Sequence, residues 1–259
     1  MSRLLAALLL LLFPSFSVAA QRIVVLAPAA ADIIERLDAA ALVVGKTRNV
    51  QEFPHAQKVG SHIRPNLEII TSLEPDLLVV SSNKFFSKGM AETVEAQTFF
   101  YNPNSLEEIL EQTLSLAILI GREKQALALI ETQRKKLRQI KPVAVPPKVI
   151  YEITEAPLTI AGSDNILADI IAKAGGEFVS GGQRKMLRFN PEAVLVLQPN
   201  VYIWQEGPMN QNPTPPDKRG HYQSLNAEYL QVEQLQYSRA NSTSFDNALQ
   251  LNRYFRERK

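Results

Sequence analysis

The sequence predicts an α/β fold of two α/β lobes joined by a single long helix. Short β-branched runs alternate with amphipathic segments before residue 103, a proline-free helical stretch follows, and the alternation then resumes. Such alternation is typical of mainly parallel sheets covered by helices. We therefore divide the chain into a signal peptide at 1–20, a first lobe at 21–103, a connecting helix at 104–141 and a second lobe at 142–259.

The start of the chain has the pattern of a secretory signal peptide. One arginine is followed by an apolar run from Leu4 to Phe13, and the small residues Val18 and Ala20 precede Gln21. This run is too short to cross a bilayer core of about 30 Å, which favours a cleaved signal over a membrane anchor. Because the chain has no cysteine, a bacterial lipid anchor is excluded. We expect an exported, soluble protein that is cleaved before Gln21.

The first lobe is expected to alternate strands and helices. Pro28 ends the first strand, and Asn66 and Pro75 delimit a short helix that precedes a buried apolar strand. The expected strands are 22–27, 42–47, 77–80 and 98–102, and the expected helices are 29–40, 67–73 and 89–97.

Residues 104–140 are expected to form the helix that connects the lobes. The stretch lacks proline and keeps a helical apolar period. Ser105 and Glu108 match a capping box at its start, and basic residues near its end suit the negative end of a helix dipole. One continuous helix would run roughly 50 Å. The alternative is two helices broken at Gly121, and we favour the single helix.

The second lobe repeats the alternation after the proline-rich stretch KPVAVPPK. A polar, proline-rich loop is expected at 207–220. The expected strands are 148–154, 158–162 and 229–235, the expected helices are 165–176 and 242–258, and a helix–strand unit is expected at 190–204.

One phrase occurs in both lobes. Residues 66–80 and 190–204 each begin with Asn, carry Glu two residues later, and continue through Leu-x-Pro into an apolar run. The matching register indicates an equivalent helix–strand unit in each lobe. Glu68 and Glu192 would then lie in the first turns of their helices, where a carboxylate complements the helix dipole.

Charge and motifs exclude several functions. The formal net charge is +2, which gives no reason to expect a nucleic-acid partner. There is no Cys nucleophile, no Gly-x-Ser-x-Gly elbow and no Gly-rich phosphate loop. The three histidines are far apart in sequence, with no metal-ligand spacing. We therefore expect no catalytic residue, no resident cofactor and no metal site.

Basic and aromatic residues gather in the loops that follow the predicted strands. Ligands of open α/β sheets bind beyond the carboxyl ends of the strands, and guanidinium groups match anionic oxygens. Two facing lobes would therefore form a basic cleft. The candidate ligand-binding residues are Arg48, His62, Lys84, Arg184, Arg188, Tyr222 and Arg239.

The chain resembles the periplasmic substrate-binding proteins of iron–siderophore, haem and vitamin B12 ABC importers. The resemblance is carried by RIVVLAPAAADII, VGKT, KVGSHIRPNLEIITSLEPDLLVVS and LTIAGSDNILADIIAKAGGEFV, which follow the family order along most of the chain. It implies the class III periplasmic binding protein fold, in which a rigid helix joins two lobes that close only slightly. It also implies a monomer in the periplasm that binds a small-molecule metal chelate.

The resemblance further implies a membrane partner. In the family, the acidic residue of each Asn-x-Glu helix start meets arginine pockets of an ABC permease, which has two transmembrane subunits and an ATPase. By resemblance, Glu68 and Glu192 are the permease-docking pair.

Two departures from the family pattern affect the ligand. The Ser-x-Thr-Glu that usually follows the first strand is replaced by Ala29–Asp32, so a hydroxyl contact is missing. Cobalamin binders use several cleft tryptophans, whereas this chain has only Trp204. His62, His221 and Tyr222 leave haem open, while the basic loops favour an anionic ferric chelate. A zinc or manganese receptor of the related long-helix class and an exported α/β enzyme are the alternatives.

Overall fold

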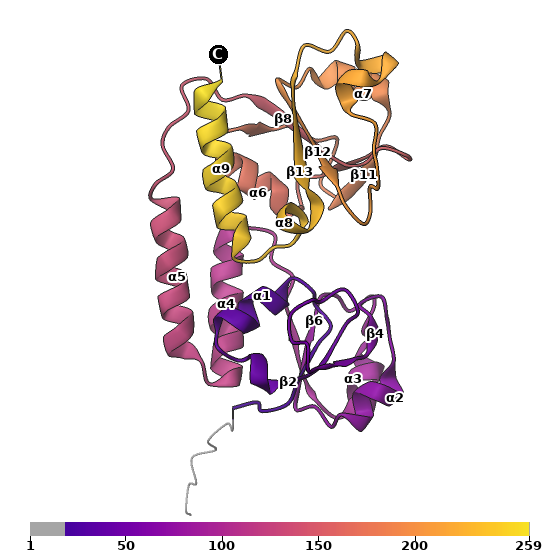
Figure 1. Ribbon diagram of the computed structural model, residues 1–259, viewed down its shortest axis with the longest axis vertical. Helices are drawn as coiled ribbons and strands as arrows, with labels where there is room; N and C mark the ends of the chain where they lie inside the picture. Colours follow the sequence, from indigo (N-terminus) through magenta and orange to yellow (C-terminus); the bar gives the residue numbers. More distant parts are fainter. Residues whose placement is uncertain (1–18, 259) are drawn as a thin grey trace, which may run out of the picture.

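The computed structural model describes residues 19–258. It shows two α/β lobes, one above the other, with helices packed along one side of both (Figure 1). Most of the predicted signal peptide lies outside the described residues. No helix of the described part is both long and apolar enough to cross a membrane.

The first lobe contains a five-stranded parallel sheet in the order β3-β2-β1-β6-β7. Residues of β1 and β6 alternate between two cores: Ile23 and Val79 pack on the side of the helical hairpin described below, whereas Val24 and Leu78 pack on α2 and α3. Burial of both faces explains why these strands are continuous apolar runs. The sheet comprises β1 Ile23–Val25, β2 Val43–Lys46, β3 Gln57–Lys58, β6 Leu77–Val80 and β7 Gln97–Phe100, and the helices are α1 Ala30–Arg36, α2 Leu67–Ser72 and α3 Lys88–Val94.

Two short strands, β4 Gly60–Ser61 and β5 Arg64–Pro65, form a small antiparallel ladder apart from this sheet. A 3-10 turn at Ala40–Leu42 leads into β2. The sequence pattern did not indicate these short elements.

The connection between the lobes corrects one prediction. The fold class is confirmed, but residues 104–141 form two helices, α4 Leu106–Ile120 and α5 Glu123–Leu137, rather than one. Gly121 ends α4 with φ +62°, and its N–H donates to Ala117 and Ile118 carbonyls. Glycine adopts this left-handed conformation without steric cost and so stops the helix.

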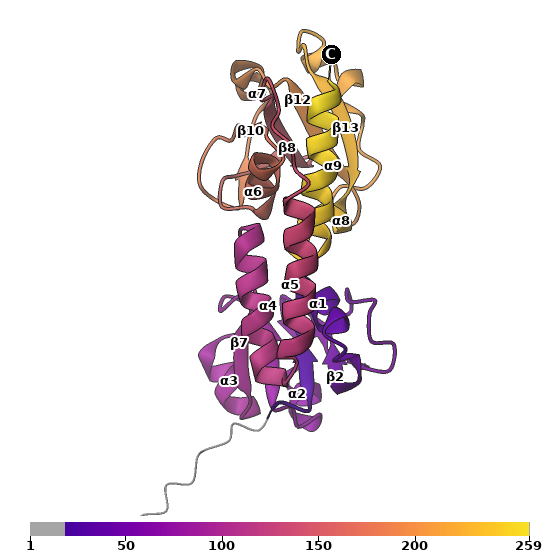
Figure 2. The same cartoon turned by 90° about the vertical axis from the view of Figure 1, so that its left-hand side faces the viewer.

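The two helices form an antiparallel hairpin that spans both lobes (Figures 1 and 2). α4 starts at the second lobe, where the Leu106 N–H donates to Asp169 (2.7 Å). It ends at the first lobe, where the side chain of Arg122 in the following turn donates to the Asp38 carbonyl (3.5 Å). α5 returns to the second lobe and pairs with it through Lys136 and Asp246 (2.8 Å). Both helices bury apolar residues on the body of the protein, among them Leu110 and Leu116 of α4 and Ile130 of α5.

The second lobe contains a six-stranded mixed sheet in the order β11-β9-β8-β12-β13, with β10 also paired to β8. β8, β12 and β13 are parallel, and β9 and β11 run antiparallel at one edge. The strands are β8 Lys148–Thr154, β9 Thr159–Ala161, β10 Glu177–Phe178, β11 Met186–Arg188, β12 Val201–Glu206 and β13 Glu228–Glu233, and the helices are α6 Ile166–Lys173, α7 Pro191–Leu197, α8 Gln234–Ser238 and α9 Thr243–Glu257.

The repeated phrase folds as an equivalent unit in each lobe. Asn66 caps α2 by accepting from the Ile69 N–H (3.1 Å), and Asn190 caps α7 by accepting from the Ala193 N–H (2.7 Å). Each helix leads into a central parallel strand, β6 or β12. The prediction of two equivalent helix–strand units is confirmed.

Buried contacts join the lobes at the base of the gap between them. The Tyr101 hydroxyl of the first lobe donates to the Ala240 carbonyl of the second (3.0 Å). The Asp32 carboxylate accepts from the Ser242 N–H (3.0 Å) and from Arg36 (2.8 Å). Asp32 therefore ties the first helix of one lobe to the start of α9 in the other.

Candidate functional site

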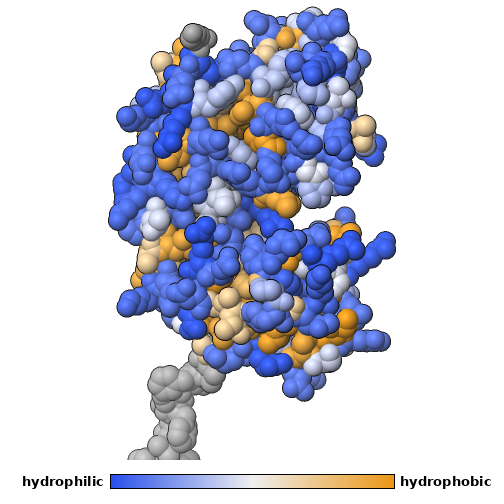
Figure 3. All heavy atoms as spheres, viewed as in Figure 1, coloured by the Kyte–Doolittle hydropathy of each residue, from blue (hydrophilic) through white to orange (hydrophobic). Residues whose placement is uncertain are grey.

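A cavity of about 440 Å³ lies between the two lobes. The surface is hollowed there on the side away from the α4–α5 hairpin (Figure 3). Its walls come from both lobes: Pro28, Ala29, Arg48, Asn49, Gln51, His62 and Ser81 from the first, and Pro208, Met209, Gln234, Leu235, Ser238 and Arg239 from the second.

Most of these residues follow the carboxyl end of a parallel strand. Pro28 comes after β1, Arg48 after β2, Ser81 after β6, and Met209 and Gln234 after β12 and β13. Because parallel strands end at the same edge of a sheet, each lobe gathers its loops at the cleft.

A smaller cavity of about 150 Å³ adjoins the first and shares Pro28, Ala29, Ser81 and Ser238 with it. Its other lining residues are Ala27, Tyr101, Asn102, Pro103, Asn165, Ile166, Lys185 and Ala240. The cleft therefore has a larger and a smaller compartment, and both lie between the lobes.

The larger compartment is lined by basic and neutral residues, with no acidic residue among the described side chains that form it. The Arg48 guanidinium is exposed and makes no ion pair with the described residues. Arg239 reaches across the cleft and donates to the Asn49 carbonyl of the other lobe (2.8 Å). The compartment therefore has a positive potential that suits an anionic ligand.

His62 is the one histidine among the described residues that line the larger compartment. Burial, and secondarily the charge of Arg48, lowers the pKa of its imidazole from the ordinary value of 6.5. Its Nδ1 is buried and has no hydrogen-bond partner among residues 19–258. The ring packs edge-on against Phe85, with centroids 6.1 Å apart. A neutral imidazole at neutral pH is able to accept a hydrogen bond or to coordinate a metal.

The structure thus brings together three of the candidate ligand-binding residues, Arg48, His62 and Arg239. Three others are exposed and line neither compartment. Lys84 lies over the Phe85 ring, 5.6 Å from its centroid. Arg184 precedes β11 and Arg188 lies at its end.

Tyr222 is placed in the core of the second lobe and not in the cleft. It is 1% exposed and packs on Tyr202, with centroids 5.4 Å apart. Trp204 is also buried in this core and lines neither compartment of the cleft. Strand-end position alone could not distinguish a residue that points into the lobe from one that points into the cleft.

A buried ion pair between Arg219 of loop 207–220 and Glu152 of β8 helps to position the cleft wall. Arg219 contacts both carboxylate oxygens of the fully buried Glu152, at 2.6 and 2.9 Å. Tyr202 donates to the same carboxylate (2.5 Å), and burial and then this carboxylate raise the pKa of Tyr202 far above its ordinary value. Arg219 also donates to the Thr214 carbonyl (2.8 Å), which fixes the loop that carries Met209.

Several lining residues carried no signal in the sequence. Met209 is 51% exposed and Leu235 is 37% exposed at the cleft, and Gln234 is buried beside them. The Oε1 atom of the Gln234 side-chain amide accepts from the Met209 N–H (2.7 Å). Neutral side chains in loops have no pattern that would separate them from ordinary surface residues.

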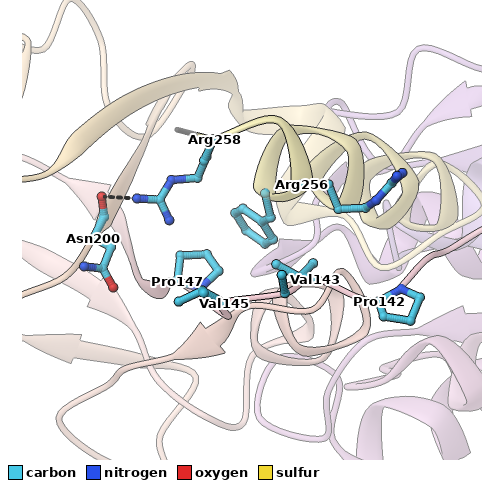
Figure 4. A pocket seen from close by; sticks show the side chains of 9 residues that line it. Pro142, Val143, Val145, Pro147, Asn200, Arg256 and Arg258 are labelled. Carbon is cyan, nitrogen blue, oxygen red and sulfur yellow. Dashed lines mark hydrogen bonds between the residues drawn. The ribbon is translucent and has the colours of Figure 1, made fainter.

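A further cavity of about 500 Å³ lies at the other end of the second lobe, between residues 142–147 and the end of α9 (Figure 4). Arg258 there is already paired with Glu228 (2.7 Å). The cavity is next to the amino end of β8, opposite the end at which the cleft lies. Among the described residues, no group of three His, Cys, Asp or Glu side chains is arranged as a metal site.

The two predicted docking acids are both exposed at the second helical position. Glu68 follows the Asn66 cap of α2, and Glu192 follows the Asn190 cap of α7. Neither forms an ion pair within the described part of the chain. α2 and α7 lie on the side of the molecule away from the hairpin, one in each lobe (Figure 1).

Comparison with protein families gives a match to the model described as periplasmic binding protein, over residues 23–234. The chain belongs to the periplasmic binding protein family. The match extends across both lobes and the α4–α5 hairpin. No curated protein sequence matches this periplasmic binding protein.

Solved structures share the fold of this periplasmic binding protein at low sequence identity. An ABC transporter substrate-binding protein from Listeria monocytogenes EGD-e is 17% identical, with TM-score 0.74, and the match covers 90% of this chain and 97% of that one. The vitamin B12 binding protein BtuF of Vibrio cholerae is 18% identical, with TM-score 0.75 and coverages of 91% and 96%. IsdE of S. aureus complexed with heme is 21% identical, with TM-score 0.73 and coverages of 90% and 98%. These neighbours are binding proteins rather than enzymes.

Proposed function

We propose that the protein is the substrate-binding component of an ABC importer and that it captures an anionic metal chelate in the cleft between its lobes. The observation that carries this proposal is the larger compartment, which presents Arg48, His62 and Arg239 without an acidic lining residue. The structural neighbours support this class of ligand: one is a vitamin B12 binding protein and another was solved in complex with heme.

The lining favours an anionic chelate over cobalamin. Guanidinium groups form charge-assisted hydrogen bonds with carboxylate and catecholate oxygens, which are stronger than those to neutral acceptors. Cobalamin offers neutral amides to such groups, and Trp204 is buried in the second lobe rather than in the cleft. Ferric siderophores with free carboxylates or catecholates and haem fit these cations better.

His62 would contact the metal or an acceptor group of the chelate. Its imidazole is neutral at pH 7, because burial and Arg48 lower its pKa. Met209 lies in the same compartment on the opposite lobe and provides a polarizable apolar contact. Lys84, Arg184 and Arg188 would attract an anionic chelate from the surface, although they line neither compartment in this structure.

Capture and release, without turnover, would constitute the mechanism. The buried contacts of Tyr101 and Asp32 and the two-helix connection link the lobes at the base of the cleft. Such links favour a small closing motion over a wide hinge opening. The protein would act in the periplasm as a monomer after cleavage of its signal peptide.

Glu68 and Glu192 would dock the loaded protein onto the two transmembrane subunits of the permease, which works with its ATPase. Both carboxylates are exposed, without an ion-pair partner among the described residues, and belong to equivalent units of the two lobes. Arginine groups on the permease would pair with them.

The docking role is tested by the double variant Glu68→Ala with Glu192→Ala. We expect ligand affinity to stay at the native value and transport in cells to fall. Glu123→Ala with Glu177→Ala is the matched control, because these acids are exposed and lie outside α2 and α7. Lost ligand binding in the first variant, or equal transport in both, would contradict the docking role.

The ligand class is tested by thermal unfolding with haemin, ferric citrate, ferrichrome and cyanocobalamin. A compound that binds only the folded protein raises its melting temperature. We expect haemin or ferric citrate, which carry free anionic groups, to raise it most. A larger shift with the neutral ferrichrome or cyanocobalamin would overturn the anionic class, and no shift with any of the four would overturn the receptor function.

A further inference from the structure

The smaller compartment of the cleft contains a cation of its own, which does not line the larger compartment. It is lined by neutral residues and one cation, Lys185, and none of its described lining residues is acidic. Its volume of about 150 Å³ equals roughly five waters at liquid density. This is room for one short side arm of a ligand and too little for a second chelate.

The backbone holds Lys185 firmly at this place. Its carbonyl accepts from the Gly162 N–H (3.2 Å) and from the Asn165 side-chain amide (3.0 Å). A Cβ at Gly162 would lie 1.8 Å from the Arg184 carbonyl oxygen. The glycine therefore permits the loop before β11 to press onto the turn between β9 and α6, which directs Lys185 toward the other lobe.

The ammonium group of Lys185 has a neutral partner. It donates to the Asn102 side-chain oxygen of the first lobe (2.7 Å), and Asn102 is held in turn by Gln112 through its own N–H (2.9 Å). No carboxylate of residues 19–258 lies within 4.0 Å of this ammonium. Partial burial lowers the pKa of Lys185, although Glu108 and Asp164 act in the opposite direction.

We propose that the smaller compartment is a second anion subsite, in which Lys185 binds a carboxylate arm of the ligand while the body of the chelate occupies the larger compartment. The arm would replace the neutral Asn102 oxygen with a charged acceptor, which makes the stronger hydrogen bond. The two compartments share Pro28, Ala29, Ser81 and Ser238, so one ligand can extend from the larger compartment into the smaller.

This inference rests on the proposed function and narrows its substrate class. The ligand would carry at least two anionic groups, one for Arg48 or Arg239 and one for Lys185. Haemin has two propionates, and ferric citrate has free carboxylates. Ferrichrome and cyanocobalamin lack such a pair.

The test measures the dissociation constants of native protein and of the Lys185→Gln variant for haemin, its dimethyl ester and ferric citrate. A hydrogen bond to a charged group contributes enough that its loss weakens binding about tenfold or more. We expect this loss in Lys185→Gln for haemin or ferric citrate. For the dimethyl ester we expect native protein and variant to bind equally weakly, because the ester lacks the anionic arm.

Lys173→Gln is the matched control, because Lys173 is exposed like Lys185 but lies at the opposite end of α6, outside both compartments. Equal affinity of Lys185→Gln and native protein for an anionic chelate would overturn the second subsite and leave the proposed function intact. Binding of ferrichrome or cyanocobalamin alone would also overturn it. Binding of none of these compounds would contradict the proposed function itself.

Discussion

At the scale of single residues, the cleft combines fixed cations with one neutral imidazole. Burial, and secondarily the charge of Arg48, lowers the pKa of His62 and so favours its neutral form. The folded protein therefore binds fewer protons at His62 than the unfolded chain does. This site stabilises the fold less as the pH falls below 6.5, and it presents a free lone pair at neutral pH.

The pKa of His62 is the first prediction. An NMR titration of the imidazole should give a value below 6.5 in native protein. Arg48→Gln should raise this value, because it removes the second cause of the shift and leaves burial in place. A native value at or above 6.5, or a fall in the Arg48→Gln variant, would contradict the described environment of His62.

The buried pair of Glu152 and Arg219 provides the second prediction. Glu152→Leu and Arg219→Met each remove one partner of this pair. Arg219→Met leaves the fully buried Glu152 without its cation and should lower the free energy of unfolding by about 3–5 kcal/mol, whereas after Glu152→Leu the guanidinium keeps a longer contact with Glu155 (3.5 Å). The double variant Glu152→Leu with Arg219→Met should lose less than either single variant. Urea unfolding measures all three, and additive losses would show that the two residues do not stabilise the loop as a pair.

The sequence could identify residue types at the cleft more readily than the direction of their side chains. Arg48, His62 and Arg239 were recognisable as basic residues near strand ends, and they line the larger compartment. Tyr222 was equally near a cleft loop but is 1% exposed, because its ring packs on Tyr202. Its orientation depends on that tertiary contact, which has no local pattern.

At the scale of secondary-structure elements, the turn at Gly121 determines how the lobes are joined. Its left-handed backbone reverses the chain, so that α4 and α5 pack side by side instead of forming one rod. At the same end of the hairpin, the Arg122 side chain donates to the Asp38 carbonyl of the first lobe (3.5 Å). The turn is therefore part of the link between hairpin and first lobe.

Gly121→Ala is the third prediction. A non-glycine residue at φ +62° should cost about 1–2 kcal/mol of folding free energy. Gly89→Ala is the control, since its Cβ meets no atom within 4 Å and alanine favours the helix in which it lies. Equal stability of the two variants by thermal unfolding would contradict the left-handed turn.

Element positions were largely predictable because their signals are local. The strand at 77–80 and the strand at 148–154 have the predicted bounds, since apolar β-branched runs end at clear turn residues. The single helix over 104–141 was wrong because helical periodicity continues across Gly121 without a visible break. Gly121 was the one local signal for the hairpin. Whether a glycine at this position ends a helix depends on how the apolar faces of the two segments pack on the lobes, and this packing has no local pattern in the sequence.

At the scale of the whole molecule, the cleft has two compartments, and contacts between the lobes close it at its base. Tyr101 and Asp32 join the lobes at that base, whereas Arg239 and Lys185 join them within the cleft through neutral oxygen acceptors. An anionic ligand would offer these two cations better acceptors without disturbing the base. Ligand capture would then replace contacts between lobes with contacts to the ligand, at little change in overall shape.

The cleft cations provide the fourth prediction and the most direct test of the binding site. Isothermal titration with haemin or ferric citrate should show one chelate per protein, and Arg48→Gln should weaken it about tenfold, because a charge-assisted hydrogen bond is lost. Arg48→Gln with Arg239→Gln should weaken it further. Arg253→Gln with Arg256→Gln on α9 is the control, because both arginines are exposed outside the cleft. Native affinity in the folded Arg48 and Arg239 double variant would contradict binding of an anionic chelate between the lobes.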